Sequence, residues 1–355
     1  MAEEVKEQDI LQAKIAIERL KFRRRALAIG ALPALIALMI YSMRIGVADI
    51  SLLQTLKIIA ARWIDFPEAI SPKHETIIWV LRIPRVLVAA VAGATLGMSA
   101  CVTQAILKNH LASPYTLGVS SSAAFGAALG MILKIGFFEG VWAIIANSFI
   151  FSLLPALVIF FANKKRVLSG EGIILCGVAI SFVFSSLNTL LQFVAEDDAL
   201  RNSLFWTVGD LTRAALWQLP YLLAAMLLFF VLAFWLASRI NIIKMGDDDA
   251  RAMGVNVEKI KIVSIIAACL ATASVICFTG SIGFVGLLAP HIGRLIIGGD
   301  ERYLIPVSAL LGALLLIIAD IVAKSFFAPV ILPVGAVTAL IGGPVLVYFL
   351  LRSKS

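Results

Sequence analysis

The chain has 355 residues, of which 61% are hydrophobic and only 15% are charged, whereas soluble domains carry about 25% charged residues. This composition excludes an ordinary soluble protein and predicts one helical domain in a lipid bilayer. The net charge of +8 does not indicate nucleic-acid binding, because Lys and Arg lie mainly in the polar segments between apolar runs. We therefore expect no nucleic acid among its partners.

Apolar runs of about 20 residues, the length that spans the hydrocarbon layer of a membrane, recur along the chain. They predict an all-α polytopic membrane protein with about ten transmembrane helices. In chain order these helices are residues 26–45, 86–107, 116–133, 141–162, 172–194, 215–236, 262–279, 282–297, 304–323 and 329–351. Because the seventh and eighth runs almost touch and the eighth is rich in Gly and Pro, nine spans is the alternative count.

The polar N-terminal segment and the distribution of positive charge predict the orientation. Residues 1–25 form a polar tail, and residues 26–355 form a single transmembrane domain. With ten spans, 20 of the 30 Lys and Arg residues lie on the side of this tail. Since cytoplasmic loops carry the excess of positive charge, both termini are predicted to be cytoplasmic. Residues 8–20 are predicted either to lie as a helix on the inner membrane surface or to act only as the orientation signal.

The polar segment of residues 239–261, on the predicted cytoplasmic side, is expected to contain two short helices. Asp247, Asp248 and Asp249 suit the first turn of a helix, where carboxylates favour the positive end of the helix dipole. Gly254 suits the position just after the last turn, and Asn256 suits the start of the next helix. Such a segment predicts a docking surface for a cytoplasmic partner.

The sequence lacks the residue patterns of common catalytic sites. It has no Gly-x-x-x-x-Gly-Lys-Ser/Thr nucleotide motif, no His-Glu-x-x-His motif and no Gly-x-Ser-x-Gly motif. Its three histidines lie on distant segments, and its four cysteines lie in apolar runs without metal-ligand spacing, as expected of small buried hydrophobic residues. We predict no catalytic residue, no metal site and no cofactor, and the chain cannot hydrolyse ATP by itself.

Charged residues near the predicted spans are candidates for function, because charge is costly at membrane depth. Asp320 and Lys324 are four residues apart, a spacing that predicts an ion pair on one helix face. Arg82 and Arg85 flank Pro84 just before the second span, on the predicted outer side. They are expected either to anchor to lipid headgroups or to receive an acidic partner, for which Arg supplies forked donors.

Five ordered blocks of sequence resemble a known family. The blocks are LRIPR (81–85), KNHLASPYTLGVS (108–120), GFVGLLAPH (283–291), ADIVAK (319–324) and LPVGAVTA (332–339), the last followed by Gly343 and Pro344. Over roughly residues 78–351 the chain is similar to the FecCD-type (type II) permeases of ABC importers for iron–siderophores, haem and vitamin B12.

The resemblance implies the architecture and the partners of the chain. It implies ten helices per subunit and two permease subunits, as a homodimer, around a central path in the cytoplasmic (inner) membrane. It also implies two ABC ATPase subunits inside and a substrate-binding protein outside. The cargo would be an iron(III)–siderophore or a related chelate, haem or a corrinoid. The alternative is an ion-coupled secondary transporter, for which Asp320 and Glu171 are the candidate coupling residues.

The resemblance also implies three groups of site residues. Docking of the binding protein is assigned to Arg82, Arg85 and Lys324, the last of which lacks the two-pronged guanidinium of the family's Arg. Coupling to the ATPase is assigned to Gly246, Ala250, Arg251, Met253, Gly254 and Val255. The cytoplasmic gate is assigned to Asn109 and Leu111, beside His110, which stands where the family usually has Pro.

Overall fold

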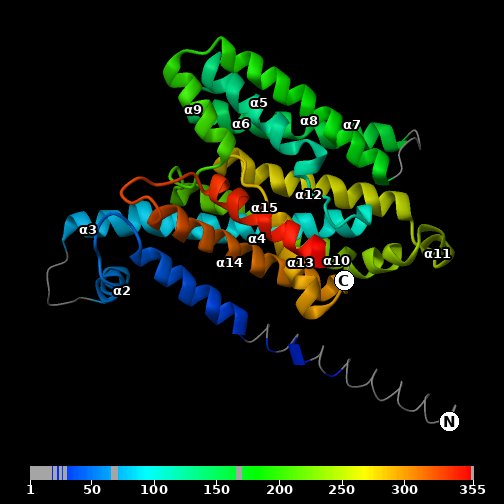
Figure 1. Cartoon of the computed structure of the whole chain (residues 1–355), viewed down its shortest axis with the longest axis horizontal. Helices are drawn as coiled ribbons and strands as arrows, with labels where there is room; N and C mark the ends of the chain where they lie inside the picture. The colour runs from blue at the N-terminus through cyan, green and yellow to red at the C-terminus, as the bar shows by residue number, and fades with distance from the viewer. Residues whose placement is uncertain are drawn as a thin grey trace.

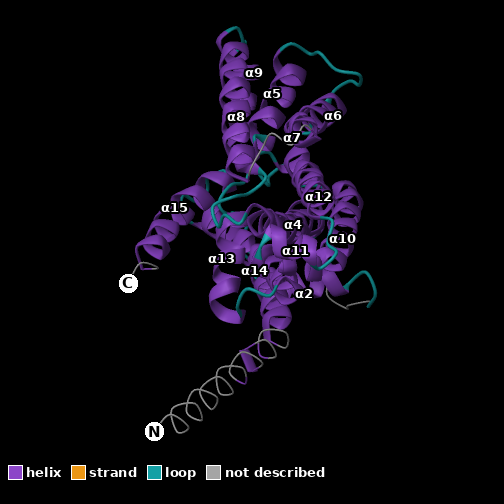
Figure 2. Ribbon diagram, turned by 90° about the vertical axis from the view of Figure 1, so that its right-hand side faces the viewer, coloured by secondary structure: helices purple, strands orange, loops and turns teal. Residues whose placement is uncertain are grey.

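The computed structural model describes residues 30–64, 71–164 and 170–352, together with Glu18, Phe22, Arg23 and Ala26. The predicted polar tail, residues 1–25, lies outside these residues except for three positions. In the described part of the chain all regular structure is helical, and no strand occurs (Figure 2).

Ten apolar helices in the described residues follow the ten predicted spans in order. Six of them are at least 18 residues long and apolar enough to cross a membrane: Pro72–Leu107, Val141–Phe161, Gly170–Phe193, Leu216–Met245, Val257–Thr279 and Glu301–Ser325. Four are shorter: Gly30–Arg44, Val119–Ile132, Val285–Ile297 and Val334–Tyr348. The predicted all-α polytopic fold is confirmed, and the seventh and eighth spans are separate helices.

The individual elements subdivide some of these apolar helices. In chain order they are α2 (Leu52–Ala60), α3 (Pro72–Thr76), a π-helical segment (Ile77–Arg82), α4 (Ile83–Leu107), a 3-10 turn (Tyr115–Leu117), α5 (Val119–Ile132), α6 (Val141–Ser152), α7 (Leu154–Lys164), α8 (Gly170–Phe193), α9 (Asp197–Val208), a 3-10 turn (Leu216–Gln218), α10 (Leu219–Met245), α11 (Asp247–Ala252), α12 (Val257–Thr279), α13 (Val285–Ile297), α14 (Glu301–Ser325) and α15 (Val334–Arg352).

Helix α4 is the centre of the bundle. Seen along the helices in Figure 2, it is surrounded by α10, α12, α13 and α14, and nearly all of its 25 residues are buried. Its crossing with α14 is very close, because a Cβ on Gly93 would lie 2.3 Å from the Gly312 carbonyl oxygen and one on Gly312 would lie 2.2 Å from the Gly93 carbonyl oxygen. These glycines let the two backbones touch, as small residues do in membrane helix pairs.

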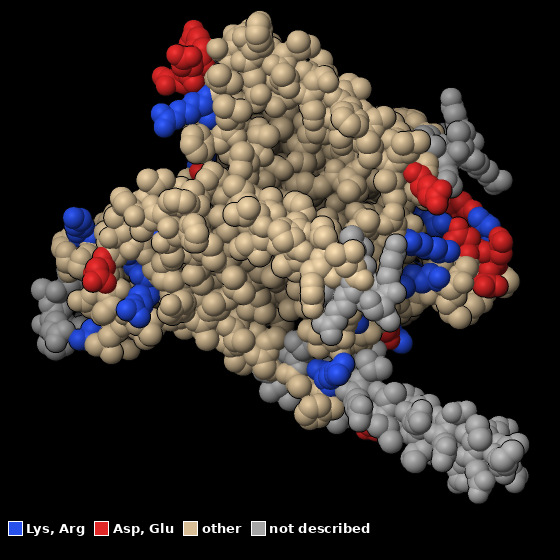
Figure 3. All heavy atoms as spheres, in the orientation of Figure 1, with Lys and Arg blue, Asp and Glu red and all other residues tan. Residues whose placement is uncertain are grey.

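The bundle has two ends, which we call the α11 end and the α3 end. In Figure 1 the long helices run between α11 on the right and α2 and α3 on the left. On the face seen in Figure 3, Lys, Arg, Asp and Glu gather toward these two ends, and the surface between them is largely uncharged. This distribution suits a bundle whose middle lies in hydrocarbon.

The predicted start of the second span is wrong. Arg82 and Arg85 do not lie in a loop before it, because Pro72–Leu107 is one continuous apolar helix. Pro84 lies in the first turn of α4, and the turn before it is π-helical, with the Ile83 N–H donating to the carbonyl of Ile78. The wider π turn accommodates a ring that would clash with an α-helical carbonyl, so the helix continues through the proline.

The prediction of two short helices within residues 239–261 is also wrong. Helix α10 continues to Met245 and α12 begins at Val257, so only α11 lies between them. The long helices extend into the polar segment because their inward faces stay apolar. Ile240 and Ile243 are both fully buried, and their burial stabilises the last turns of α10 despite the polar residues around them.

Candidate functional site

The short helix α11 ends as the sequence predicts. Gly254 has φ +79°, its N–H donates to the Arg251 carbonyl at 2.9 Å, and the Val255 N–H donates to the Ala250 carbonyl at 2.9 Å. These two bonds form a Schellman motif, whose left-handed residue is usually glycine. The Asn256 side chain then accepts a hydrogen bond from the first turn of α12, so the turn between the two helices is fully specified by local chemistry.

The two faces of α11 differ in exposure. Ala250 is fully buried, so it packs the helix onto its own chain and does not face a partner. Arg251 and Met253 are exposed, and Met253 is 63% exposed. The Arg251 guanidinium holds the carboxylates of Asp248 and Glu258, each at 2.7 Å. Of the residues predicted to contact the ATPase, those on the Arg251 and Met253 side are therefore accessible.

Asp247 fixes the start of α11 to two other helices. Its carboxylate accepts a hydrogen bond at 2.9 Å from Lys108, which follows α4, and another from Lys261 in the first turns of α12. Burial raises the pKa of Asp247, but the hydrogen bonds from Lys261 and Lys108 outweigh this effect and leave it below its ordinary value. The carboxylate is charged at neutral pH, so it links α11 to α4 and α12.

The predicted gate residues lie in the turn that follows α4. Lys108 has φ +51°, and the Asn109 side-chain oxygen accepts a hydrogen bond at 2.8 Å from the Leu111 N–H. Leu111 is 43% exposed. Because the same Lys108 binds Asp247, this turn is tied directly to α11. The structure thus brings the predicted gate and the predicted coupling segment together at the α11 end.

At the α3 end, Arg82 caps the helix Gly30–Arg44. Its guanidinium donates hydrogen bonds to the carbonyls of Met43 at 2.8 Å, Arg44 at 2.9 Å and Ala48 at 2.5 Å. The last carbonyls of a helix lack partners within the helix and carry its negative dipole end, so a guanidinium suits them. Arg82 is only 7% exposed, and its role within the chain is to close this helix end.

Arg85 and Lys324 share one carboxylate inside the bundle. The Arg85 Nε lies 2.6 Å from the Asp320 Oδ1, and the Lys324 Nζ lies 2.8 Å from the Asp320 Oδ2. The Lys324 Nζ also donates to the Ser42 hydroxyl at 2.9 Å. Asp320, Arg85 and Lys324 are 1%, 6% and 7% exposed. The predicted Asp320–Lys324 pair is confirmed, whereas the sequence did not predict Arg85 as a second partner.

The three predicted docking residues therefore lie in one region, which we call the cation cluster: Arg82, Arg85, Lys324 and the carboxylate of Asp320. All three cations already have partners within the chain. No residue pattern could have shown this, because the partners of Arg82 are main-chain carbonyls near residue 44, and such oxygens carry no sequence signal. The docking role of these residues stays a prediction.

Neither candidate residue for ion coupling is an unpaired carboxylate in the bundle. Asp320 is held by two cations, and Glu171 lies in the first turn of α8, close to a helix end. Proton-coupled transporters use ionisable groups inside the membrane as proton relays. The geometry of these two residues does not favour that mechanism.

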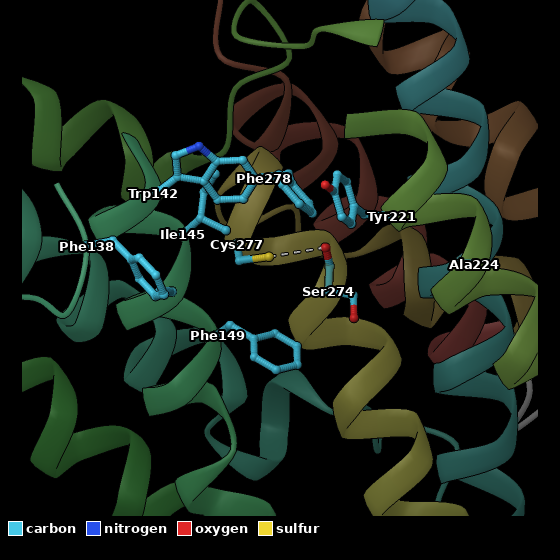
Figure 4. A pocket seen from close by; sticks show the side chains of 10 residues that line it. Phe138, Trp142, Ile145, Phe149, Tyr221, Ala224, Ser274, Cys277 and Phe278 are labelled. Carbon is cyan, nitrogen blue, oxygen red and sulfur yellow. Dashed lines mark hydrogen bonds between the residues drawn. The ribbon is translucent and has the colours of Figure 1, made fainter. Parts of the chain in front are cut away.

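A pocket of about 570 Å³ opens between α6, α10 and α12 (Figure 4). Its walls are mainly aromatic and aliphatic, with Trp142, Tyr221 and Phe278 in the upper part of the view in Figure 4 and Phe149 below them. The Ser274 hydroxyl, one of its few polar groups, donates to a backbone carbonyl of its own helix. The pocket suits an apolar group, and it contains none of the predicted docking, coupling or gate residues.

The described residues contain no group of three or more His, Cys, Asp or Glu side chains that could hold a metal ion. The carboxylates at the two ends instead bind Lys and Arg side chains of the same chain.

Comparison with known proteins agrees with this arrangement. The model of the FecCD transport family matches residues 34–352. The hemin transport system permease protein of Yersinia pestis is 33% identical over 283 residues, which cover 78% of this chain and 84% of that protein. A vitamin B12 import system permease protein of Salmonella typhi is 34% identical over 305 residues, which cover 85% and 92% of the two chains.

A solved structure shares the fold. It is described as an inward-facing conformation of a metal-chelate type ABC transporter, with a TM-score of 0.80 and 27% identity, and the match covers 91% of this chain and 98% of that one. The ten-helix bundle with an accessible helix at one end is thus an integral membrane permease of the ABC transporter class. Because the family model matches most of its length, the chain belongs to the FecCD transport family.

Proposed function

We propose that this chain is the non-catalytic permease subunit of an ATP-driven importer in the cytoplasmic membrane. The observation that carries the proposal is α11, a short helix with exposed Arg251 and Met253 at the end of an apolar bundle. The sequence has no nucleotide-binding loop, so energy has to enter through contact with an ATPase. The α11 end is the place where such contact is available.

The cargo we propose is an iron(III)–siderophore or a related chelate, either haem or a corrinoid. Relatives at 33–34% identity are named as hemin and vitamin B12 permeases. The lack of a metal-binding group among the described residues fits a metal that arrives enclosed in its chelator. The apolar walls of the bundle fit a large ligand with an organic surface.

A second copy of the chain is proposed to pack beside α8. In α8 only 17% of the most apolar stretch is buried, and its exposed residues include Ser185 and Ser186, each with a hydroxyl group. Hydroxyl groups in a membrane helix tend to face other helices or a water-filled path rather than lipid. This supports a homodimer with α8 near a central path, on which two ATPase subunits and one binding protein would act.

We assign the gate to the turn of Asn109 and Leu111, because Lys108 ties this turn to α11 through Asp247. A displacement of α11 by the ATPase would move the turn without further connecting elements. The gate and the coupling segment are then one mechanical unit at the cytoplasmic end.

Docking of the binding protein is proposed at the opposite end, on the cation cluster. Its three cations outnumber the one carboxylate of Asp320, so the cluster has excess positive charge that acts on an acidic partner surface.

Lys324→Met removes one positive charge and leaves Arg85 paired with Asp320. We expect weaker binding of the loaded binding protein at low salt and a smaller difference at high salt, with Lys259→Met at the other end as the control.

Reconstitution tests the function as a whole. The permease, its ATPase and its binding protein in proteoliposomes should take up a ferric siderophore, haem or a corrinoid only with ATP and an intact ATPase. A protonophore should not reduce this uptake. Uptake that persists without the ATPase and collapses with the protonophore would show a secondary transporter instead.

A further inference from the structure

Lys244, in the last turn of α10, ties that helix to the turn between α13 and α14. Its Nζ donates to the Gly299 carbonyl at 2.5 Å and to the Glu301 carboxylate at 2.7 Å. Glu301 is the first residue of α14 and is fully buried. Lys244 lies three residues before α11 begins, so this contact is next to the predicted coupling segment.

A second contact holds the same turn one helical turn earlier on α10. The Asn241 amide donates to the Asp300 carboxylate at 2.7 Å, and the Asn241 oxygen accepts from the Glu301 N–H at 2.9 Å. Asn241 and Lys244 are three residues apart and so lie on one face of the helix. Both side chains of α10 form hydrogen bonds with the turn between α13 and α14. Helix α10 therefore cannot rotate or slide past α14 without breaking several hydrogen bonds.

The Glu301 carboxylate continues the connection into the centre of the bundle. Its second oxygen, Oε2, lies 3.1 Å from the Cys101 Sγ on α4 and accepts a hydrogen bond from the thiol. Cys101, predicted as a small buried hydrophobic residue, is thus a donor. Through one carboxylate the end of α10 is joined to α14 and to the central helix α4.

This arrangement is not explained by stability alone. Glu301 is fully buried, whereas the Lys244 side chain is 28% exposed. Burying the carboxylate costs solvation energy, and well-packed apolar residues of similar volume are often as stable as such a charge with its partner. The pair does, however, fix the relative position of the helices that contribute it, since the buried Glu301 carboxylate cannot be left without a counter-charge. Because the pair lies beside α11, a fixed position of these helices could carry a movement of α11 into the bundle.

We propose that the Lys244–Glu301 pair transmits the displacement of the coupling helix α11 to α14 and α4. The proposal rests on the proposed function as an ATP-driven permease. On its other side α11 is tied by Asp247 to Lys108 and Lys261. Movement imposed on α11 by an ATPase is therefore shared between the end of α4, the start of α12 and, through Lys244, the start of α14.

The test compares substrate transported per ATP hydrolysed. The double variant Lys244→Met with Glu301→Gln removes both charges, so no unpaired buried charge remains, and the control Lys259→Met removes an exposed ammonium from the same end. In proteoliposomes with ATPase and binding protein, the double variant should retain the ATPase subunit and hydrolyse ATP. Its transport per ATP should fall about tenfold, within the usual range of coupling between sites, whereas the control should match the unaltered protein.

Cys101→Ala gives a milder second measurement, since it removes only the contact with α4. The transport ratio should fall by a smaller factor than in the double variant. A purely structural role would lower the amount of assembled complex or both rates together, with an unchanged ratio. An unchanged ratio in both variants overturns the proposal, while absence of ATP-dependent uptake by the unaltered complex would instead overturn the proposed function.

Discussion

Charged side chains connect helices at both ends of the bundle, but their surroundings differ. In the cation cluster at the α3 end, Arg85, Asp320 and Lys324 are at most 7% exposed. At the α11 end Glu301 is buried, but the side chains of Asp247 and Lys108, which hold α11 itself, are 32% and 39% exposed. Buried charges cannot lose a partner without a large cost, whereas partly exposed pairs contribute little and respond to salt. The first region can hold a fixed structure, and the second can hold a segment that has to yield to a partner.

The largest expected effect is in the buried region. Asp320→Ala leaves Arg85 and Lys324 buried without a counter-charge, which should destabilise the protein by about 3–5 kcal/mol. Thermal unfolding in detergent should therefore occur at a clearly lower temperature than for the unaltered protein. Lys324→Met, which keeps Arg85 paired with Asp320, is the matched control and should lose much less. Equal stability of Asp320→Ala and the unaltered protein would show that these charges are solvated after all.

An intermediate effect is expected where α11 ends. Gly254→Val forces a β-branched residue to φ +79°, at a local cost of about 1–3 kcal/mol. An added Cβ would meet no heavy atom within 4 Å, so conformation and not collision causes the loss. Uptake and retention of the ATPase should fall, while binding-protein docking at the other end stays intact. Gly254→Asn should be nearly normal, because Asn tolerates this conformation, and equal activity of both variants would contradict the argument.

A smaller effect is expected for Asp247→Asn at the same end. Losing two partly exposed ion pairs should cost at most about 1 kcal/mol per pair, with the effect reduced at high salt. Asp248, whose side chain is 99% exposed, provides the control Asp248→Asn, which should have no measurable effect. The pKa of Asp247 in the folded protein lies below its ordinary value. The charged carboxylate therefore stabilises the fold fully at a pH above that ordinary value, and this contribution is lost as the pH falls through the lowered pKa.

The smallest predicted effect is a pH dependence at the gate turn. Burial lowers the pKa of His110, and the positive charges of Arg294, His291 and Lys244 lower it further. The folded protein therefore binds a proton here less readily than the unfolded chain. The free energy of unfolding should fall as the pH drops from the ordinary pKa of about 6.5 toward the lowered pKa of His110. Above about pH 6.5 this residue should make no contribution to the pH dependence. In thermal unfolding between pH 7.5 and 5.5, His110→Gln should lose less stability at the acidic end than the unaltered protein. Identical pH profiles of the two proteins would contradict the prediction.

The sequence alone determined the elements whose cause is local. The ten spans follow from the length of the apolar runs, because a membrane requires each one to satisfy its own backbone hydrogen bonds. The end of α11 at Gly254, the cap at Asn256 and the Asp320–Lys324 pair involve residues within a few positions of one another. Interactions at such short separations are fixed by helix geometry, so a residue pattern predicts them.

Helix ends near charged residues were less predictable. The polar character of residues 239–261 suggested two short helices between the spans, yet the buried faces at Ile240 and Ile243 extend α10 through part of this segment. The π-helical turn before Pro84 likewise keeps one helix continuous through the place where the sequence predicted the start of the second span. In both places packing against neighbouring helices overrides a local signal, since most helical stability in proteins comes from such packing.

Only the tertiary structure decided the partners that charged residues find on other helices. Arg82 binds carbonyls of the first helix, Arg85 binds Asp320 on α14, and Glu301 joins Lys244 and Cys101 from two other helices. These residues are far apart in the chain, and which of them meet depends on how the helices cross around α4. A charge in the sequence shows that a partner is needed at membrane depth, but only the packed bundle selects which group supplies it.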